Sequence, residues 1–359
     1  MKTLLRLLIK SQHQRNRSGS DKTDKGMTLI ELLVGAIMAF LIITPMIGFV
    51  VNMLNTDRRE QVKSNTEQDI QAALDFIAQD LSQAIYIYDN NPALTNTLTT
   101  TATGIPALLA GNFIPPRDQN KTPILVFWKR ELIENSMPVR PGEEPNDCQL
   151  TPTGATTNCN DTYVLALVAY YQVRDTNAIW CQPSGGTCPT RIVRYQIKDG
   201  LRDPYSTDPS KPYFTNVSKP QEPSDAFNPS FDISNPTKSV TNPNAPWDPP
   251  EVLVNYIDHS DKPIDSEECQ KALGRPTTKT GITTAPIPES TLIVTDTAST
   301  PNTNSFYACV DTSNNIARVT LRGNSLRRIQ TDGTEYDFDK SAYFPTASVQ
   351  VQGLGARGK

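Results

Sequence analysis

Residues 32–51 read LLVGAIMAFLIITPMIGFVV, twenty consecutive residues without a charged side chain. A helix of this length spans the roughly 30 Å hydrocarbon core of a bilayer. A secretory signal has an apolar region of roughly 7 to 15 residues that is followed by a small-residue cleavage site, and this stretch fits neither criterion. It therefore predicts a membrane-spanning helix.

The residues before this span are basic, and the remainder of the chain is acidic. Residues 1–26 contain seven Lys and Arg against two Asp, a net charge of +5, and because the whole chain carries -4 the rest carries -9. A basic flank favours the cytoplasmic side, so the part after the span is predicted to lie outside the cytoplasm. The acidic balance gives no reason to expect nucleic acid as a partner.

All six cysteines lie in the region predicted to be external, at Cys148, Cys159, Cys181, Cys188, Cys269 and Cys309. An even number of external cysteines is the pattern of disulfides. Proximity in the sequence favours the pairs Cys148–Cys159 and Cys181–Cys188, which leaves Cys269 with Cys309. A zinc site is the alternative, but no C-x-x-C motif occurs and His259 is the only external histidine.

A short motif lies immediately before the span. Residues 25–33 read KGMTLIELL, which resembles the processing site of type IV prepilins and pseudopilins, where a dedicated prepilin peptidase cuts after the glycine and methylates the new N-terminal residue. The resemblance implies cleavage after Gly26, an N-methylated Met27 at the mature N-terminus, and Glu31 at the fifth mature position, where the family has its glutamate. The family more often has phenylalanine at the first mature position.

Glu31 is an ionisable residue at the start of a membrane span, which costs a few kcal/mol unless the group reaches water or a partner. Cleavage would create a cation, because the α-amino group of Met27 has a reference pKa of about 8. The two groups could pair within one helix, or Glu31 could neutralise the amine of a neighbouring subunit; the resemblance implies the second. The alternative is a plain signal anchor whose Glu31 reaches the headgroups. Pro45 is either a tolerated kink or, as the resemblance implies, part of a segment that melts on assembly.

Apolar residues continue at helical spacing beyond the span, which predicts one helix from Thr28 to about residue 86. Its apolar stripe contains Ile70, Ala73, Leu74, Ile77, Leu81, Ala84, Ile85 and Tyr88. Runs of β-branched and aromatic residues then predict strands at 124–128, 163–173, 191–197, 252–257, 291–294, 307–310 and 316–322. In the last run, apolar residues alternate with Arg and Thr, as in a strand buried on one face.

The predicted fold is α+β and pilin-like: a long N-terminal transmembrane and amphipathic helix packed on an antiparallel β-sheet with long loops. The predicted parts are a cleaved cytoplasmic leader at 1–26, the transmembrane half of the helix at 27–54, its amphipathic half at 55–88, and a β-rich head at 89–359. Residues 199–250 contain 11 prolines and predict a surface loop. A contact arm is the alternative, because Tyr213, Phe214 and Trp247 are scattered through that region.

Two longer stretches extend the resemblance: TDRREQVKSNTEQDIQAALDFIAQDLSQAIYIYD at 56–89 and ILVFWKREL at 124–132. They resemble the hormogonium polysaccharide secretion pseudopilins of filamentous cyanobacteria, a minor pseudopilin group. The resemblance implies a single-pass inner-membrane protein with a periplasmic head, supporting polysaccharide export and gliding. The implied partners are other pseudopilins or pilins, the prepilin peptidase, and an assembly platform with its ATPase.

Other chemistry has weaker support. His259 lies between Asp258 and Ser260, but neighbours in sequence rarely form a catalytic triad, and a solvated loop is the alternative. No phosphate-binding loop motif occurs.

A cluster of acids could bind calcium or form a solvated turn: Asp332, Glu335, Asp337 and Asp339. Four arginines could form a basic face for a partner subunit or an anionic polysaccharide, or could simply be solvated: Arg318, Arg322, Arg327 and Arg328.

The sequence thus favours a structural subunit of a pseudopilus, with no enzymatic activity and no cofactor. A membrane-anchored binding protein or adhesin that does not polymerise is the second hypothesis. An external enzyme has the least support.

Overall fold

A computed structural model of the chain describes residues 28–91, 104–145, 159–214, 222–236, 238–275, 287–296 and 302–355. Gly26, Met27 and Cys148 lie outside the described residues, so the leader and its cleavage site stay predictions. The chain divides into two units between Arg58 and Arg59.

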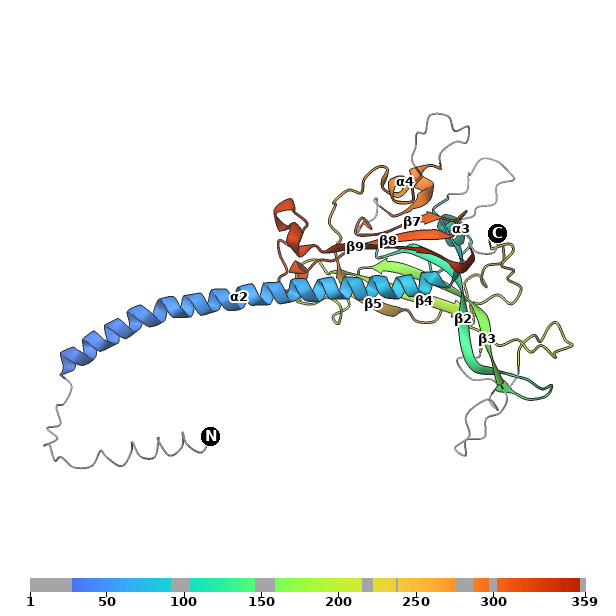
Figure 1. Cartoon of the computed structure of the whole chain (residues 1–359), viewed down its shortest axis with the longest axis horizontal. Coiled ribbons are helices and arrows are strands. Elements are labelled where there is room, and N and C mark those ends of the chain that lie inside the picture. Colours follow the sequence, from blue (N-terminus) through green and yellow to red (C-terminus); the bar gives the residue numbers. More distant parts are fainter. Residues whose placement is uncertain are drawn as a thin grey trace, which may run out of the picture. The chain divides into compact units, whose positions relative to one another are not determined.

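The helix α2 (Leu29–Ser82) is continuous over 54 residues (Figure 1). Its first part exposes its large apolar side chains and is long and apolar enough to cross a membrane, which is compatible with a single-pass anchor. The helix continues through Pro45. Proline lacks the N–H that would bond the carbonyl four residues earlier, that of Leu41. The neighbouring Thr44 Oγ1 donates to the Phe40 carbonyl at 2.8 Å.

From Arg59 onward, α2 carries the predicted apolar stripe. The five members at most 2 % exposed that lie within α2 are Ile70, Ala73, Leu74, Ile77 and Leu81. The predicted end of the helix is wrong, because α2 stops at Ser82 and strand β1 (Ala84–Ile87) follows. The residues AIYIY at 84–88 satisfy both helical spacing and strand alternation, and pairing with the neighbouring strand decides between the two.

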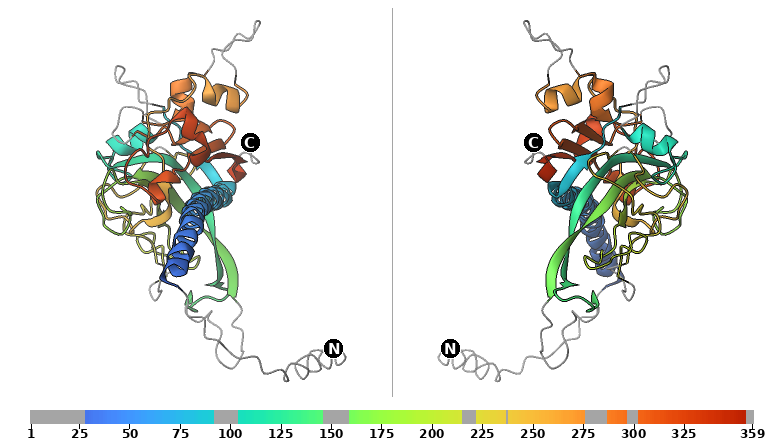
Figure 2. Two further views of the ribbon diagram at one scale, coloured as in Figure 1. Left: turned by 90° about the vertical axis from the view of Figure 1, so that its left-hand side faces the viewer. Right: turned by 90° about the vertical axis from the view of Figure 1, so that its right-hand side faces the viewer.

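The head contains two antiparallel sheets, where a single sheet was predicted. The first has the order β1-β2-β3-β4-β5, with β2 (Lys121–Pro138), β3 (Cys159–Val173), β4 (Thr190–Lys198) and β5 (Glu251–Ile257). The second has the order β6-β7-β8-β9, with β6 (Ile293–Val294), β7 (Phe306–Asp311), β8 (Ile316–Arg322) and β9 (Thr346–Gln352). Figure 2 shows β2 and β3 as a long twisted ribbon.

Short helices connect these strands: α3 (Ile105–Ala110), α4 (Glu268–Ala272), α5 (Glu289–Leu292), η2 (Leu326–Arg328) and η3 (Phe338–Tyr343). Six of the seven predicted runs lie in strands, and the run at 291–294 does so only in part because it begins in α5. Strands β1 and β9 were not predicted.

One main core joins the buried stripe of α2 to residues from both sheets. In β8 the predicted inner residues Ala317, Val319 and Leu321 are fully buried. The prediction that the other face meets solvent is wrong at Thr320 and Arg322, which are 8 % and 5 % exposed.

The proline-rich region 199–250 lacks helices and long strands within its described part, as predicted for a loop, but it packs on the first sheet. The ring of Phe231 stacks on Trp128 of β2 at a centroid distance of 3.9 Å, and Phe227 meets the same indole edge-on at 6.1 Å. Trp128 Nε1 donates to the Tyr88 hydroxyl, which in turn donates to the Pro236 carbonyl. Part of this region therefore covers a face of the sheet, which corrects the prediction of a plain surface loop.

Candidate functional site

The first turn of α2 places Glu31 in a helix-capping arrangement. The Glu31 N–H bonds to Oγ1 of Thr28 at 3.3 Å and to the Thr28 carbonyl at 3.0 Å. The sequence Thr-Leu-Ile-Glu matches the capping box, in which a Ser or Thr side chain and a Glu or Gln three residues later satisfy the free N–H groups of the first turn. Thr28 therefore caps the first turn through its side chain, and the role of Glu31 in assembly stays a prediction.

A cluster of charged residues lies where α2 meets the first sheet. Asp80, in the last turn of α2, accepts from Lys129 of β2 at 2.9 Å, from Arg194 of β4 at 2.7 Å and from the Tyr170 hydroxyl of β3 at 2.7 Å. All three charged side chains are at most 10 % exposed. The carboxylate thus links the helix to three adjacent strands.

The electrostatics of this cluster depend on its two cations. The carbonyl end of a helix carries partial negative charge and disfavours an acid, and the last turn of α2 contains no basic residue. Burial alone would raise the pKa of Asp80, but hydrogen bonding and charge from Arg194, together with Lys129, hold that pKa below its usual value. Burial raises the pKa of Tyr170 well above its usual value, so Tyr170 stays a hydrogen-bond donor.

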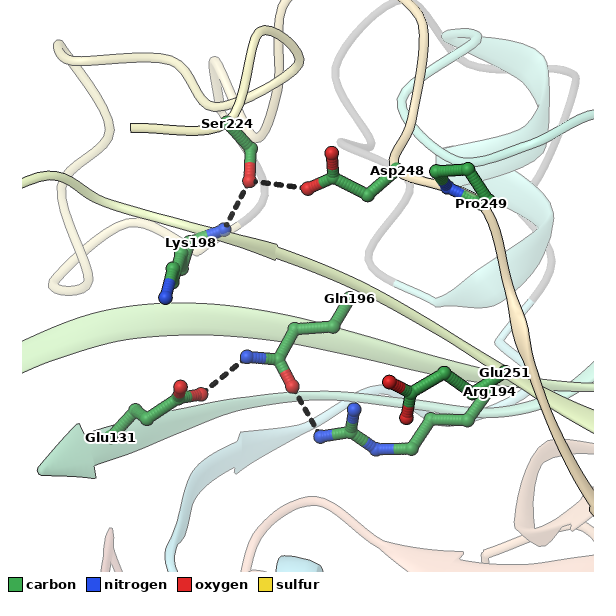
Figure 3. Close-up of a pocket in the computed structure, with 8 residues that line it drawn as sticks. All are labelled: Glu131, Arg194, Gln196, Lys198, Ser224, Asp248, Pro249 and Glu251. Carbon is green, nitrogen blue, oxygen red and sulfur yellow. Dashed lines mark hydrogen bonds between the residues drawn. The ribbon is translucent and has the colours of Figure 1, made fainter. Parts of the chain in front are cut away.

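A cleft of about 320 Å³ opens beside this cluster. Figure 3 shows its lining: Glu131, Arg194, Gln196, Lys198, Ser224, Asp248, Pro249 and Glu251. The Gln196 amide lies between Arg194 and Glu131, accepting from the first and donating to the second. Ser224 of the proline-rich region accepts from the Lys198 N–H and donates to Asp248 at 2.8 Å.

This cleft presents hydrogen-bond donors and acceptors and charges of both signs. The Ser224 hydroxyl donates to Asp248, and the described lining contains no histidine that could act as its base. Its charged and hydrogen-bonding side chains are suited to binding a polar group.

The four arginines predicted to form a basic face do not form one. Arg322 is buried and donates to Asp258 at 2.8 Å and to the Ser305 hydroxyl. Arg328 pairs with Asp69 of α2 and lies over the Tyr256 ring at 4.5 Å. Arg318 is partly exposed and donates to the Ser348 hydroxyl. A face for anionic polysaccharide at these residues is therefore not supported.

Arg327 has a structural role that the sequence did not indicate. The residue is 1 % exposed, and its guanidinium donates to the carbonyls of Pro183, Gly185 and Thr187. These carbonyls lie within the loop closed by the Cys181–Cys188 disulfide. Arg327 thus fixes the loop to η2.

Two predicted disulfides are confirmed, Cys181–Cys188 and Cys269–Cys309. Cys159 is also disulfide-bonded, but its predicted partner Cys148 lies outside the described residues, so that pairing stays a prediction.

His259 is half-buried, which corrects the alternative of a solvated loop. Burial first, and the nearby charge of Arg174 second, lower its pKa. Ser260 donates directly to Asp258 at 2.6 Å, and Asp258 also accepts from Arg322. Ser260, His259 and Asp258 are therefore not arranged as the nucleophile, base and orienting acid of a catalytic triad.

The calcium candidates Asp332, Glu335, Asp337 and Asp339 do not converge. Asp337 instead accepts from the Asp339 N–H and caps η3. Within the described ranges, no three His, Cys, Asp or Glu side chains are placed to hold a metal ion.

Asp80 is the central residue that the sequence reasoning missed. It follows Ile77 by three residues and Ala73 by seven, so it occupies an apolar-stripe position. An acid at such a position needs a buried cation, and this signal could have identified it.

In comparisons with known proteins, no family model matched the chain, and no curated protein or solved structure matched it.

Proposed function

We propose that this chain is a minor pseudopilin, a structural subunit of a type IV pilus-like or type II secretion-like filament, and not an enzyme. The observation that carries the proposal is the continuous α2, which begins at Leu29 within the KGMTLIELL motif, exposes an apolar first part and buries the stripe of its second part in the head. A helix with two such halves suits a subunit that is first anchored in a membrane and then packed among other helices.

Glu31 supports the proposal through its position. It lies in the first turn of α2, with the apolar surface following it. Cleavage after Gly26 would create the Met27 amine four residues before Glu31 in the sequence, and a neighbouring subunit would present the same amine. Pairing between subunits would neutralise both groups and favour a fixed axial register.

Mass spectrometry of the full chain extracted from membranes of a cell with prepilin peptidase tests the processing step. The proposal expects a chain that begins at N-methylated Met27. A chain that begins at Met1 in such a cell would refute it.

Substitutions at Glu31 test assembly and separate it from helix capping. Glu31→Gln removes the charge and keeps a side chain able to complete the capping box, so it should abolish incorporation into filaments as fully as Glu31→Ala. Glu60→Ala is the matched control, because Glu60 is an exposed acid of the same helix, paired with Lys63. Normal incorporation of Glu31→Gln would show that capping alone matters and would contradict the proposed pairing.

The role of the filament follows from the resemblance to the hormogonium polysaccharide secretion group. We propose that the chain supports polysaccharide secretion and gliding from the inner membrane, with the head in the periplasm, and that the peptidase and an ATPase-driven assembly platform act on it. Deletion should reduce secreted polysaccharide and surface movement together. Loss of movement with normal secretion would contradict this role.

The cleft in Figure 3 favours a second candidate, a membrane-anchored binding protein that does not polymerise. In that case both Glu31 variants would leave function intact, whereas Glu251→Gln in the cleft would impair it.

A further inference from the structure

The charged side chains of the cleft in Figure 3 differ in whether they already have a partner of opposite charge. Arg194 donates to Asp80 and to the Gln196 amide, and the same amide donates to Glu131. Glu131 also lies 3.6 Å from the Lys129 ammonium. These side chains belong to the network that fastens α2 to the first sheet. What the cleft can bind therefore depends on the charged groups outside this network.

Three charged side chains of the lining lie outside the network: Lys198, Asp248 and Glu251. Within the described ranges, neither the Lys198 ammonium nor the Glu251 carboxylate has a hydrogen bond or an ion pair. Asp248 accepts from the Ser224 hydroxyl at 2.8 Å, but this donor is neutral and leaves the negative charge uncompensated. The cleft therefore presents one free cation and two free anions.

The walls that carry these free groups are fixed by the fold. Ser224 of the proline-rich region continues the sheet edge where β5 no longer pairs with β4. It accepts from the Lys198 N–H at 3.2 Å, and its own N–H donates to the Lys198 carbonyl at 3.0 Å. Trp247, the residue before Asp248, meets the Tyr195 ring edge-on at 6.3 Å. Walls that are ordered in advance reduce the entropy that a ligand loses on binding.

The balance of free charges selects the class of ligand. A phosphate-like anion would meet two carboxylates, and a neutral ligand would cover three charges without neutralising any of them. A metal ion is not supported, because no three acids of the described chain are placed to hold one. A ligand with two positive charges and one negative charge complements the free groups one for one.

We infer that this cleft binds a free basic amino acid such as lysine, with its two ammonium groups on Asp248 and Glu251 and its carboxylate on Lys198. The cleft volume of about 320 Å³ is at the lower end of the range for small-molecule sites, about 300–1,000 Å³, which suits a molecule of this size. The Pro249 ring lines the same cleft and offers an apolar surface to the methylene chain. The site goes beyond the proposed filament role, because it requires neither assembly nor processing.

Isothermal titration calorimetry of the full chain in detergent micelles tests the site with lysine. Two analogues each lack one charge: norleucine has no side-chain ammonium, and cadaverine has no carboxylate. Both should bind about tenfold more weakly than lysine or worse, because each loses hydrogen bonds between charged groups. Absence of lysine binding, or equal affinities for lysine and norleucine, would overturn the proposal.

Substitutions in the cleft test which group holds which end of the ligand. Glu251→Gln and Asp248→Asn should each weaken lysine binding about tenfold or more. Lys198→Met should weaken lysine binding but strengthen cadaverine binding, because for cadaverine it removes only a repelling charge. Glu222→Gln is the matched control: this exposed acid of the proline-rich region does not line the cleft, so lysine binding should be unchanged.

Circular dichroism confirms that each variant is folded. Changes of the same sign for lysine and cadaverine in Lys198→Met would refute the contact between the Lys198 ammonium and the ligand carboxylate. A loss of lysine binding in Glu222→Gln as large as in Glu251→Gln would show a diffuse charge effect and would overturn the site. All these measurements use the solubilised chain, so their failure would leave the filament proposal standing, and an unprocessed chain would leave this site standing.

Discussion

Replacement of Asp80 by Asn is expected to destabilise the head strongly. The substitution keeps the size of the side chain but removes the negative charge that Lys129 and Arg194 share at 2.9 and 2.7 Å. Removing one member of a buried ion pair costs about 3–5 kcal/mol, because the remaining charge stays buried without a counter-ion. Two cations lose their counter-ion here, although Glu131 remains 3.6 Å from Lys129. For a unit of this size, the loss corresponds to a fall in unfolding temperature of about 10 °C.

Thermal unfolding of the full chain, followed by tryptophan fluorescence, measures this effect. Trp128, Trp180 and Trp247 all lie after Arg59, so the signal reports on the head unit. Asp69→Asn is the matched control: this acid is on the same helix, its side chain is 49 % exposed, and it pairs with Arg328. Exposed pairs contribute at most about 1 kcal/mol, so this variant should unfold within a few degrees of the native chain.

The pH dependence gives an independent check. The folded pKa of Asp80 is lowered, so its contribution to stability is complete above the unfolded pKa of about 3.9 and is lost as the pH falls through the folded pKa. The difference between the native chain and Asp80→Asn should therefore shrink below about pH 4. Lys129→Met added to Asp80→Asn should recover part of the stability. Equal effects of Asp80→Asn and Asp69→Asn at pH 7 would refute the reasoning.

Three further predictions concern the head. Gly323→Val should cost about 1–3 kcal/mol, because a Cβ there would lie 2.6 Å from the Thr66 methyl group; an unchanged unfolding temperature would show that α2 and β8 can move apart freely. Replacing Cys269 and Cys309 together by Ser should cost about 2–4 kcal/mol, measured by the same unfolding, and no loss would mean that the 40-residue loop is fixed by packing alone. The lowered pKa of His259 means that the unfolded chain takes up a proton first as the pH falls through about 6.5, so native stability should decrease from pH 7 to pH 5; His259→Asn should flatten this slope, and parallel slopes would contradict it.

The long helix could be predicted because its pattern extends over many turns. The charge-free stretch at 32–51 and the stripe from Ile70 to Leu81 each repeat the helical period several times. The end of the helix could not be predicted, because the five residues after Gln83 fit both the helical and the strand period. Their pairing partner is about forty residues away in β2. Strand β9 was missed because its small and polar residues give a weak hydrophobic signal.

The charged residues show the limits of sequence reasoning more clearly. Arg322 and Arg327 look like surface residues in a basic run, and what buries them is distant: Asp258 for the first, and the backbone of the Cys181–Cys188 loop for the second. Such contacts form between segments that are far apart in the sequence, and no local sequence pattern indicates them. The position of Asp80 on the apolar stripe was a readable signal, but the identity of its partners on β2 and β4 was not.

The junction between α2 and β1 has a mechanical consequence. A single residue, Gln83, separates Ser82 from Ala84, and the Asp80 cluster fastens the same turn to β2 and β4. A one-residue connection beside these ion pairs leaves few backbone dihedral angles free to rotate. Twist or tension applied to the last turn of α2 is therefore transmitted directly to the five-stranded sheet. The end of the helix and this sheet rotate together as a rigid body.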